Sequence, residues 1–355
     1  MSKQPDTGAN LLSRLVAKLR RLSHFHDQQL AQSREQQRVQ AAQQVTLDEI
    51  CALLREQNAL IAAQMRDTLA LLREVGADAG GLRSVTSDLN WKITQALKET
   101  TWRALHAGAS PLDLVGSVTQ IYSQTSEDAL IADIFSRIGE RDRFFVEFGI
   151  EDGTENTTRW LLEQGWRGIW VEGSAASVER ASAIFAGAIA ERRLTIVPAM
   201  AGPDNANDLL THANAPDSFD YLSVDIDHNT AHVWAALRAR ARVCCVEYNA
   251  ALPPSADIVV PYVADHGWDG TNWFGASLKA LERIGARKGM ALVGCDFAGV
   301  NAYFVDQEEA RGAFSEPFTA EAKYQPPRYH LVGKGGHPPS TSQRSWQVAP
   351  MMSDQ

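Results

Sequence analysis

Short apolar runs alternate with longer stretches of mixed polarity from residue 144 onward. Each run has the length of a strand buried on both faces, and the stretches between runs are long enough for helices. The expected strands are residues 144–150, 168–171, 194–197, 221–226 and 243–248, then, after a helix at 275–288, residues 291–294 and 302–305. The last two flank a tight segment that contains Gly299. The pattern predicts an α/β fold with a doubly wound, mostly parallel, seven-stranded Rossmann-like sheet and a C-terminal antiparallel hairpin.

The first 110 residues have the periodicity of helices. Apolar residues between 11 and 25, surrounded by Lys and Arg, predict an amphipathic helix that contacts either a membrane surface or a partner. A heptad pattern at 45–75, interrupted by Asn58 and Thr68, predicts either a coiled coil that forms a homo-oligomer or a helix folded back on the core. The chain then divides into a helical region at 1–110, an α/β domain at 118–310 and a Pro/Gly-rich tail at 311–355 that wraps the core or covers the site.

Charge and cysteine content narrow the classes of function. Residues 1–110 hold 14 Lys and Arg against 11 Asp and Glu, a net charge of +3. Because the whole chain has a net charge of −9, the remaining residues carry −12. An acidic α/β domain argues against nucleic acid as the substrate, because Lys and Arg contacts to phosphate dominate such binding. The four cysteines form no CxxC pair, and no apolar run approaches the 18 residues of a membrane span. We therefore expect a cytoplasmic protein without a transmembrane segment.

Residues 143–174 have the outline of a nucleotide-binding half-site: strand, glycine turn, helix, strand and acid. Gly149 and Gly153 bracket the turn, where backbone must pass close to a ligand. A helix is expected at 154–164. Glu172 follows the second strand, 23 residues after Gly149, in the position of a carboxylate that accepts hydrogen bonds from ribose hydroxyls. The half-site predicts a ligand that contains adenosine.

Three acids indicate which adenosine ligand binds. Glu151 stands where the dinucleotide fingerprint has its middle glycine, and Asp152 follows it. Two carboxylates there would repel a pyrophosphate. Glu147, on the strand before the turn, adds a third acid, and the group suits the ammonium and sulfonium of S-adenosylmethionine. The alternative is a βαβ unit whose acids face solvent.

Polar side chains follow the fourth and fifth predicted strands. Ligands of a doubly wound sheet lie at the carboxyl ends of the strands, so we assign Asp225 to the cofactor and Asp227 and His228 to proton removal from an acceptor hydroxyl. A histidine suits this role because it titrates near neutral pH. Asp225, Glu247 and Asn249 together offer an all-oxygen site for Mg²⁺, or they serve as plain hydrogen-bond acceptors.

Aromatic and polar residues are mixed at 268–274, just before the helix expected at 275–288. Such a mixture suits a sugar ring, which presents both an apolar face and hydroxyls. Trp273 and Phe274 are alternatively core residues of that helix. The segment predicts a wall of a saccharide pocket.

Several short motifs occur in a fixed order and together resemble a known family. They are YSQ at 122–124 followed by Glu127 and Asp128, FVEFGIEDG at 145–153 with Asn156, GWRGIWVE at 165–172, SVDID at 223–227, VEYN at 246–249, WDGTNWFGASL at 268–278 and VGCDFAGVNAYFV at 293–305. Over about residues 118–305 the chain resembles the FkbM-type S-adenosylmethionine-dependent methyltransferases of the class I Rossmann-like superfamily. The resemblance implies S-adenosylmethionine as the cofactor, with Tyr122 and Gln124 at the amino-acid end of this donor. It also makes a metal site at the ends of the fourth and fifth strands consistent with the family, since some class I O-methyltransferases bind a metal there.

The sequence thus predicts a methyltransferase that methylates a hydroxyl of a saccharide or saccharide-bearing metabolite. Two other functions stay open. One is a non-catalytic adaptor that recruits a partner through the N-terminal coiled coil. The other is an NAD-dependent oxidoreductase, which Glu151, Asp152 and the hairpin disfavour. The three functions differ in what they require. The methyltransferase needs a methyl donor and an acceptor, the oxidoreductase needs NAD, and the adaptor catalyses no reaction.

Overall fold

The computed structural model describes residues 63, 79–115, 120–264, 268–332, 337–340, 342 and 344–348. The chain divides into two units, Met1–Thr86 and Ser87–Gln355. The predicted amphipathic helix at 11–25 and the heptad at 45–75 lie outside the described residues, apart from residue 63. The α/β fold belongs to the second unit.

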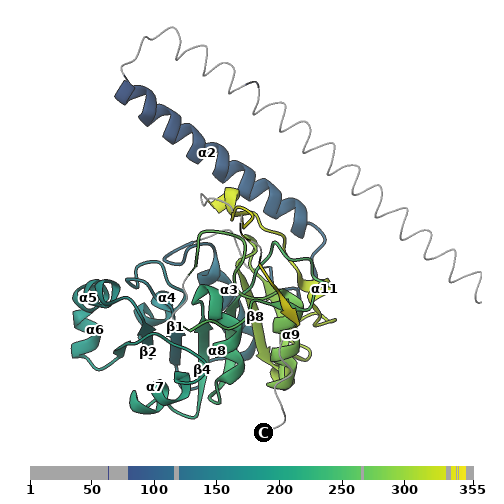
Figure 1. Ribbon diagram of the computed structural model, residues 1–355. Helices are drawn as coiled ribbons and strands as arrows, with labels where there is room; N and C mark the ends of the chain where they lie inside the picture. The colour runs from purple at the N-terminus through teal and green to yellow at the C-terminus, as the bar shows by residue number, and fades with distance from the viewer. Residues whose placement is uncertain are drawn as a thin grey trace, which may run out of the picture. The chain divides into compact units, whose positions relative to one another are not determined.

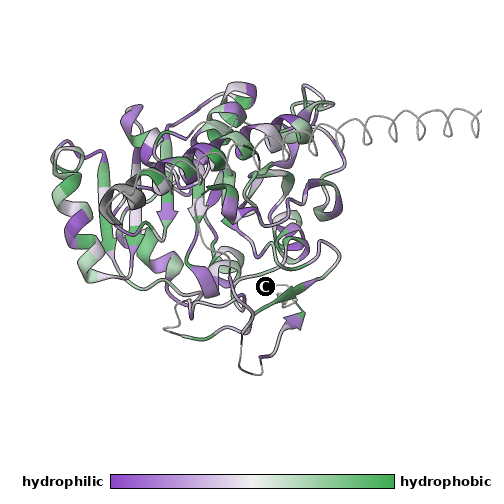
Figure 2. Cartoon of the chain, turned by 90° about the horizontal axis from the view of Figure 1, so that it is seen from above, coloured by the Kyte–Doolittle hydropathy of each residue, from purple (hydrophilic) through white to green (hydrophobic). Residues whose placement is uncertain are grey.

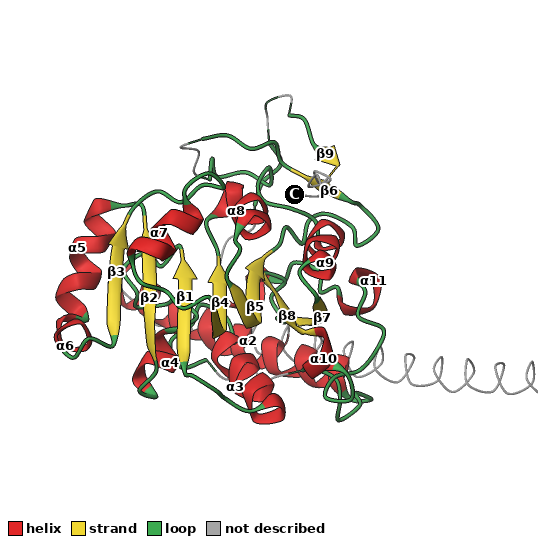
Figure 3. Ribbon diagram, turned by 90° about the horizontal axis from the view of Figure 1, so that it is seen from below, coloured by secondary structure: helices red, strands yellow, loops and turns green. Residues whose placement is uncertain are grey.

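A seven-stranded sheet with the strand order β3-β2-β1-β4-β5-β8-β7 forms the centre of this unit (Figure 3). The first five strands are parallel, and β8 runs antiparallel to both of its neighbours. The prediction of a doubly wound sheet closed by a hairpin is confirmed. The strands are β1 (Phe144–Phe148), β2 (Arg167–Glu172), β3 (Leu194–Pro198), β4 (Ser218–Val224), β5 (Arg240–Glu247), β7 (Met290–Cys295) and β8 (Asn301–Asp306). A separate pair, β6 (Ile258–Val259) and β9 (Gln347–Val348), is antiparallel.

Helices cover both faces of the sheet, which explains why its central strands are apolar on both sides (Figure 1). Alternation along β1 shows the two layers: Val146 and Phe148 belong to one hydrophobic cluster and Phe145 to the other. Figure 2 shows hydrophobic residues, in green, along these strands. The first cluster includes residues of α7 (Ala206–His212), α8 (Thr230–Ala236), α9 (Leu278–Arg287) and α11 (Ala320–Lys323). The second includes residues of α3 (Glu127–Ile138), α4 (Arg159–Glu163), α5 (Ala175–Ile184) and α10 (Gln307–Ala310).

The remaining elements are short apart from one long helix. They are α2 (Ala79–His106), α6 (Ala186–Ala190) and the 3-10 helices η1 (Asp227–Asn229) and η2 (Tyr329–Val332). None of the described helices is both long enough and apolar enough to cross a membrane.

Two helices begin later than the sequence predicts. The helix expected at 154–164 starts only at Arg159, because the backbone N–H groups of Thr157 and Thr158 donate to the carboxylate of Glu147 instead of entering a helical turn. The helix expected at 275–288 starts at Leu278, where the hydroxyl of Ser277 accepts a hydrogen bond from the N–H of Ala280 and caps it.

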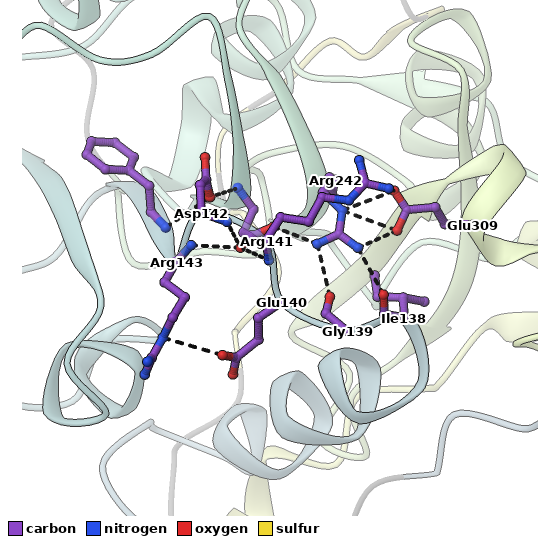
Figure 4. Close-up of polar contacts among 10 residues, drawn as sticks. Ile138, Gly139, Glu140, Arg141, Asp142, Arg143, Arg242 and Glu309 are labelled. Atoms are coloured by element: carbon purple, nitrogen blue, oxygen red, sulfur yellow. Dashed lines mark hydrogen bonds and ion pairs between the residues drawn. The ribbon is translucent and has the colours of Figure 1, made fainter.

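A buried ion network ties the strands to α3 and α10 near the amino-terminal ends of β4 and β5 (Figure 4). The guanidinium of Arg242 donates to Asp220 over 2.6 Å and to both carboxylate oxygens of Glu309. It also donates to the carbonyl oxygens of Ile138, the last residue of α3, and of Gly139, which follows the helix. The network stabilises the edge of the sheet opposite to the strands' carboxyl ends.

Candidate functional site

A cavity of about 730 Å³ opens at the carboxyl ends of the parallel strands. Residues at the ends of β1, β2, β3, β4 and β5, or shortly after them, line it, with Gly149, Glu172, Met200, Asp225 and Glu247 as examples. The strand order reverses between β1 and β4, and ligands of doubly wound sheets bind at such a switch point. The cavity is therefore in the position that the fold favours for a ligand.

Gly149 lines the cavity, and a residue with a side chain would not fit at this position unless the backbone moved. Its φ is +80°, and a Cβ atom there would lie 1.7 Å from the carbonyl oxygen of Asp225. The turn after β1 is thus held against the end of β4. Gly153 also has a positive φ, of +77°, but it does not line the cavity, and a Cβ atom there would meet the rings of Trp170 and Phe185 at 2.7–2.9 Å. The structure places this second glycine against the aromatic core and away from the predicted cofactor contact.

Glu172 fixes the glycine turn from the end of β2. One of its carboxylate oxygens accepts hydrogen bonds from the N–H groups of Ile150 and Glu151 at 3.2 and 2.9 Å, and the other accepts from Ser174 at 2.7 Å. A carboxylate has about four acceptor positions, so it can still accept hydrogen bonds from a ligand hydroxyl. Glu172 lines the cavity, as a ribose-binding acid must.

Glu147 lines the cavity and is 1% exposed. Its carboxylate accepts hydrogen bonds from Asn156, Thr157 and Thr158, through side chains and backbone N–H groups. Burial raises the pKa of this carboxyl, and the threonine hydrogen bonds oppose that rise. These partners show that Glu147 shapes the turn before α4, in addition to lining the cavity.

Three carboxyl groups crowd together at the ends of β4 and β5. Burial and the charge of Asp227 raise the pKa of Asp225 to about 7. Burial and the charges of Asp225 and Asp227 raise the pKa of Glu247 well above its usual range, and a hydrogen bond links the Asp225 and Glu247 side chains. The pKa of Asp227 is raised by burial and by Glu151 and Glu172. All three line the cavity, and Asp227 has a φ of +58°, a conformation that is uncommon outside glycine.

Two residues predicted for this site lie outside it. His228 is fully buried, its Nε2 is 3.0 Å from the carbonyl oxygen of Pro261, and its ring packs on Trp273. It does not line the cavity. Asn249 donates its amide to the carbonyl oxygens of Asn272 and Phe274 and so anchors the 268–274 segment. The geometry supports neither proton removal by His228 nor metal binding by Asn249.

No magnesium site is found at the predicted position. In the part of the chain that the structure describes, no group of three or more His, Cys, Asp and Glu side chains is arranged to hold a metal ion. Asp225 and Glu247 are hydrogen bonded to each other, and the amide of Asn249 points to backbone carbonyls.

The YSQ motif lies at the cavity only in part. Gln124 lines the cavity, whereas the ring of Tyr122 lies 4.3 Å from the guanidinium carbon of Arg159 and does not line it. Asp128 accepts hydrogen bonds from three successive N–H groups at 121–123 and so orders this segment. Glu127, quoted only as part of a motif, lines the cavity itself.

Two further walls of the cavity come from the loop after β3, which sequence reasoning missed, and from the C-terminal segment, which was predicted either to wrap the core or to cover the site. Met200 and Asn205 line the cavity from the first of these, and His337 and Tyr329 from the second. The ring of His337 lies 4.8–5.0 Å from the rings of Trp268, Phe274 and Tyr329. None of these residues had a spacing signal that joined it to the half-site.

The C-terminal segment is held on the 268–274 segment by several contacts. The N–H of Asn272 donates to Pro338, the indole of Trp273 donates to Ser345, and Arg344 forms an ion pair with Asp269 at 2.7 Å. Arg344 also lies over the ring of Trp273. These contacts place the tail beside the cavity.

Comparison with known proteins gives a likeness to solved structures alone. No protein-family model matches the chain, and no curated protein matches it. Similar solved structures include the pyocyanin biosynthetic protein PhzM, with 14% identity over 50% of this chain and 54% of that chain and a TM-score of 0.30. The N-terminal domain of EvdMO1, in the presence of SAH and D-fucose, has 12% identity over 51% and 82%, with a TM-score of 0.35. The O-methyltransferase from Bacillus cereus in complex with SAH has 17% identity over 44% and 66%, with a TM-score of 0.29.

This chain thus spans about half of the length of PhzM. At such low TM-scores these likenesses do not bear on function.

Negative charge is the dominant chemical feature of the cavity. Nine of its lining residues are Asp or Glu, and among the described lining residues none is Lys or Arg. Burial, and after it the uncompensated crowding of charge, raises the pKa values of Asp225, Asp227 and Glu247. The arrangement can bind a positively charged ligand or a ligand rich in hydrogen-bond donors, and it disfavours phosphates.

Proposed function

We propose that this protein is an S-adenosylmethionine-dependent methyltransferase that methylates a hydroxyl of a saccharide or saccharide-bearing metabolite. One observation carries the proposal: a cavity at the switch point of a doubly wound sheet combines a glycine turn and a ribose-type acid with nine carboxyl groups. A nucleoside ligand for such a cavity must be cationic. S-adenosylmethionine has a sulfonium and an ammonium and has no phosphate.

The cavity wall offers a matching surface for each part of the donor. Glu172 accepts hydrogen bonds from the ribose hydroxyls, and Val171, Met200 and Ile226 supply apolar surface for the adenine. Beside Gly149, the carboxylate of Asp225 faces the amino-acid end and the sulfonium. A dinucleotide would instead place its pyrophosphate among these acids, which electrostatics opposes.

Methyl transfer requires contact between donor and acceptor and the removal of one proton. The acceptor oxygen attacks the methyl carbon while the carbon–sulfur bond breaks, and the sulfonium becomes the thioether of S-adenosylhomocysteine. The hydroxyl proton passes to the carboxylate of Asp227, whose raised pKa makes it a better base than an ordinary aspartate. We no longer assign this proton to His228, because its ring lies outside the cavity.

The acceptor side supports a saccharide. Trp268, Phe274 and Tyr329 line the cavity near its acids and offer aromatic faces to a sugar ring. Asn301 and Asp227 offer oxygens to its hydroxyls.

A thermal-shift titration with S-adenosylmethionine, S-adenosylhomocysteine and NAD tests the cofactor. A ligand at a hundred times its dissociation constant adds about 2.7 kcal/mol, which raises the melting temperature by about 5–10 °C. We expect this rise with the two S-adenosyl compounds alone. Stabilisation by NAD alone would establish an oxidoreductase, and no stabilisation by any of the three would favour the adaptor.

Paired variants locate the site. Glu172→Gln keeps the shape of the side chain and removes its charge, so we expect S-adenosylhomocysteine binding in calorimetry to weaken about tenfold or more. Glu191→Gln makes the same change at a carboxylate outside the cavity lining and should leave binding unchanged. Equal affinity in the two variants would remove Glu172 from the site.

A further inference from the structure

The cavity continues past the proposed donor site to the junction of β5 and β8. Glu247 at the end of β5 and Asn301 at the start of β8 are direct partners in the antiparallel ladder. Their side chains therefore begin about 5 Å apart on one face of the sheet. Both residues line the cavity, and the amide nitrogen of Asn301 donates to Glu127 at 3.1 Å.

Two oxygen atoms in this pair have no hydrogen-bond partner among the described residues. They are one carboxyl oxygen of Glu247 and the amide oxygen of Asn301. The two residues are 8% and 2% exposed. Because buried acceptors are nearly always hydrogen bonded, a pair of unpartnered ones beside a cavity indicates a ligand that brings hydrogen-bond donors.

The charge beside these atoms is also uncompensated. Lys98 of α2 lies outside the cavity lining and interacts electrostatically with Glu127. Glu247 and its neighbour Asp225 instead face a lining in which none of the described residues is Lys or Arg. An aromatic ring is also present: Tyr329 lines the same cavity and interacts electrostatically with Glu247. Aromatic faces attract cations.

We propose that the methyl acceptor carries an ammonium group, as an amino sugar does, and that this group binds between Glu247 and Asn301 beside Tyr329. An ammonium has three donors and no acceptor, so it can donate to both unpartnered oxygens, and its charge stabilises the ionised form of Glu247, which burial and the charges of Asp225 and Asp227 otherwise disfavour. A neutral hydroxyl donates a single hydrogen bond and does not stabilise that ionised form. The inference rests on the proposed methyltransferase function and specifies its substrate class.

Three sugars that differ at one position test the ammonium site: D-glucosamine, D-glucose and N-acetyl-D-glucosamine. Each is titrated into the full-length protein by saturation-transfer NMR, with and without S-adenosylhomocysteine. We expect glucosamine to bind at least tenfold more tightly than the other two, because a charge-assisted hydrogen bond is worth about tenfold or more in affinity.

Variants then separate this site from the rest of the cavity. Glu247→Gln and Asn301→Ala should each weaken glucosamine binding about tenfold while S-adenosylhomocysteine still binds. Glu191→Gln removes an exposed carboxyl group outside the cavity lining and should change neither affinity. Circular dichroism confirms that each variant is folded.

Glucose binding equal to that of glucosamine would overturn the proposal, as would glucosamine binding that survives both Glu247→Gln and Asn301→Ala. Absence of glucosamine binding in both titrations would also overturn it. Failure of S-adenosylhomocysteine to bind contradicts the proposed function instead, and the titration without it still judges the ammonium site.

Discussion

Replacing Asp225 by Asn should change how the stability of the ligand-free protein depends on pH. Burial and the charge of Asp227 raise the pKa of Asp225 from 3.8 to about 7 in the folded state. The folded protein therefore holds a proton between these values that the unfolded chain has released. Stability from this group is complete below pH 4 and is lost as pH rises through 7.

The size of the effect follows from proton linkage. One bound proton changes the free energy of unfolding by about 1.4 kcal/mol per pH unit, and the proton of Asp225 is half released at pH 7, so this group accounts for a loss of about 2 kcal/mol between pH 5 and pH 7. Asparagine keeps the shape of the side chain but does not titrate. Between pH 5 and pH 7, the free energy of unfolding of Asp225→Asn should thus fall by about 2 kcal/mol less than that of the wild type.

Urea denaturation of both proteins at pH 5, 6, 7 and 8, followed by tryptophan fluorescence, measures this difference. Asp204→Asn is the matched control, because it removes an exposed carboxyl group from the other end of the cavity. The control should keep the wild-type pH dependence. If Asp225→Asn loses as much stability as the wild type between pH 5 and pH 7, Asp225 does not hold the proton and the crowding argument fails.

Two further predictions concern stability and are measured by chemical denaturation. Gly149→Ala should cost about 3 kcal/mol or more, because its Cβ atom would overlap a carbonyl oxygen at 1.7 Å, whereas Gly165→Ala, at a φ of +84° but with nothing within 4 Å, should cost only about 1–2 kcal/mol. Similar costs for the two would show that φ alone matters. Arg242→Met should cost about 3–5 kcal/mol because Asp220 stays buried without its partner, while Arg240→Met, at an exposed position on the same strand, should change stability by less than about 0.5 kcal/mol. A small loss for Arg242→Met would mean that water replaces the guanidinium.

The local pattern of the sequence was enough to predict the sheet. Each strand of the sheet lies within three residues of its predicted range, because a strand covered by helices on both faces must be apolar over its whole length. The hairpin of β7 and β8 was predicted for the same reason. Helix starts were less accurate, since a side chain distant in sequence, Glu147, takes the N–H groups that would have begun α4.

The residues of the half-site were predicted in part. Gly149, Glu172, Asp225 and Asp227 line the cavity because they follow strands that end at the same edge of the sheet. Gly153 shares the positive φ of Gly149, yet it packs on aromatic rings. A glycine in a turn of the sequence thus predicts a positive φ. Which neighbouring group leaves no room for a side chain there is seen only in the tertiary structure.

By itself, the sequence determined the order of the elements and the acids at the strand ends, because both depend on nearby residues. Only the tertiary structure decided which side chains meet. It turned His228 and Asn249 toward backbone carbonyls, and it brought Glu127, Asn301 and Tyr329 to the acids of β4 and β5. These residues are separated by up to about two hundred positions, so no local pattern could join them. Their burial and shared charge arise only when the chain folds.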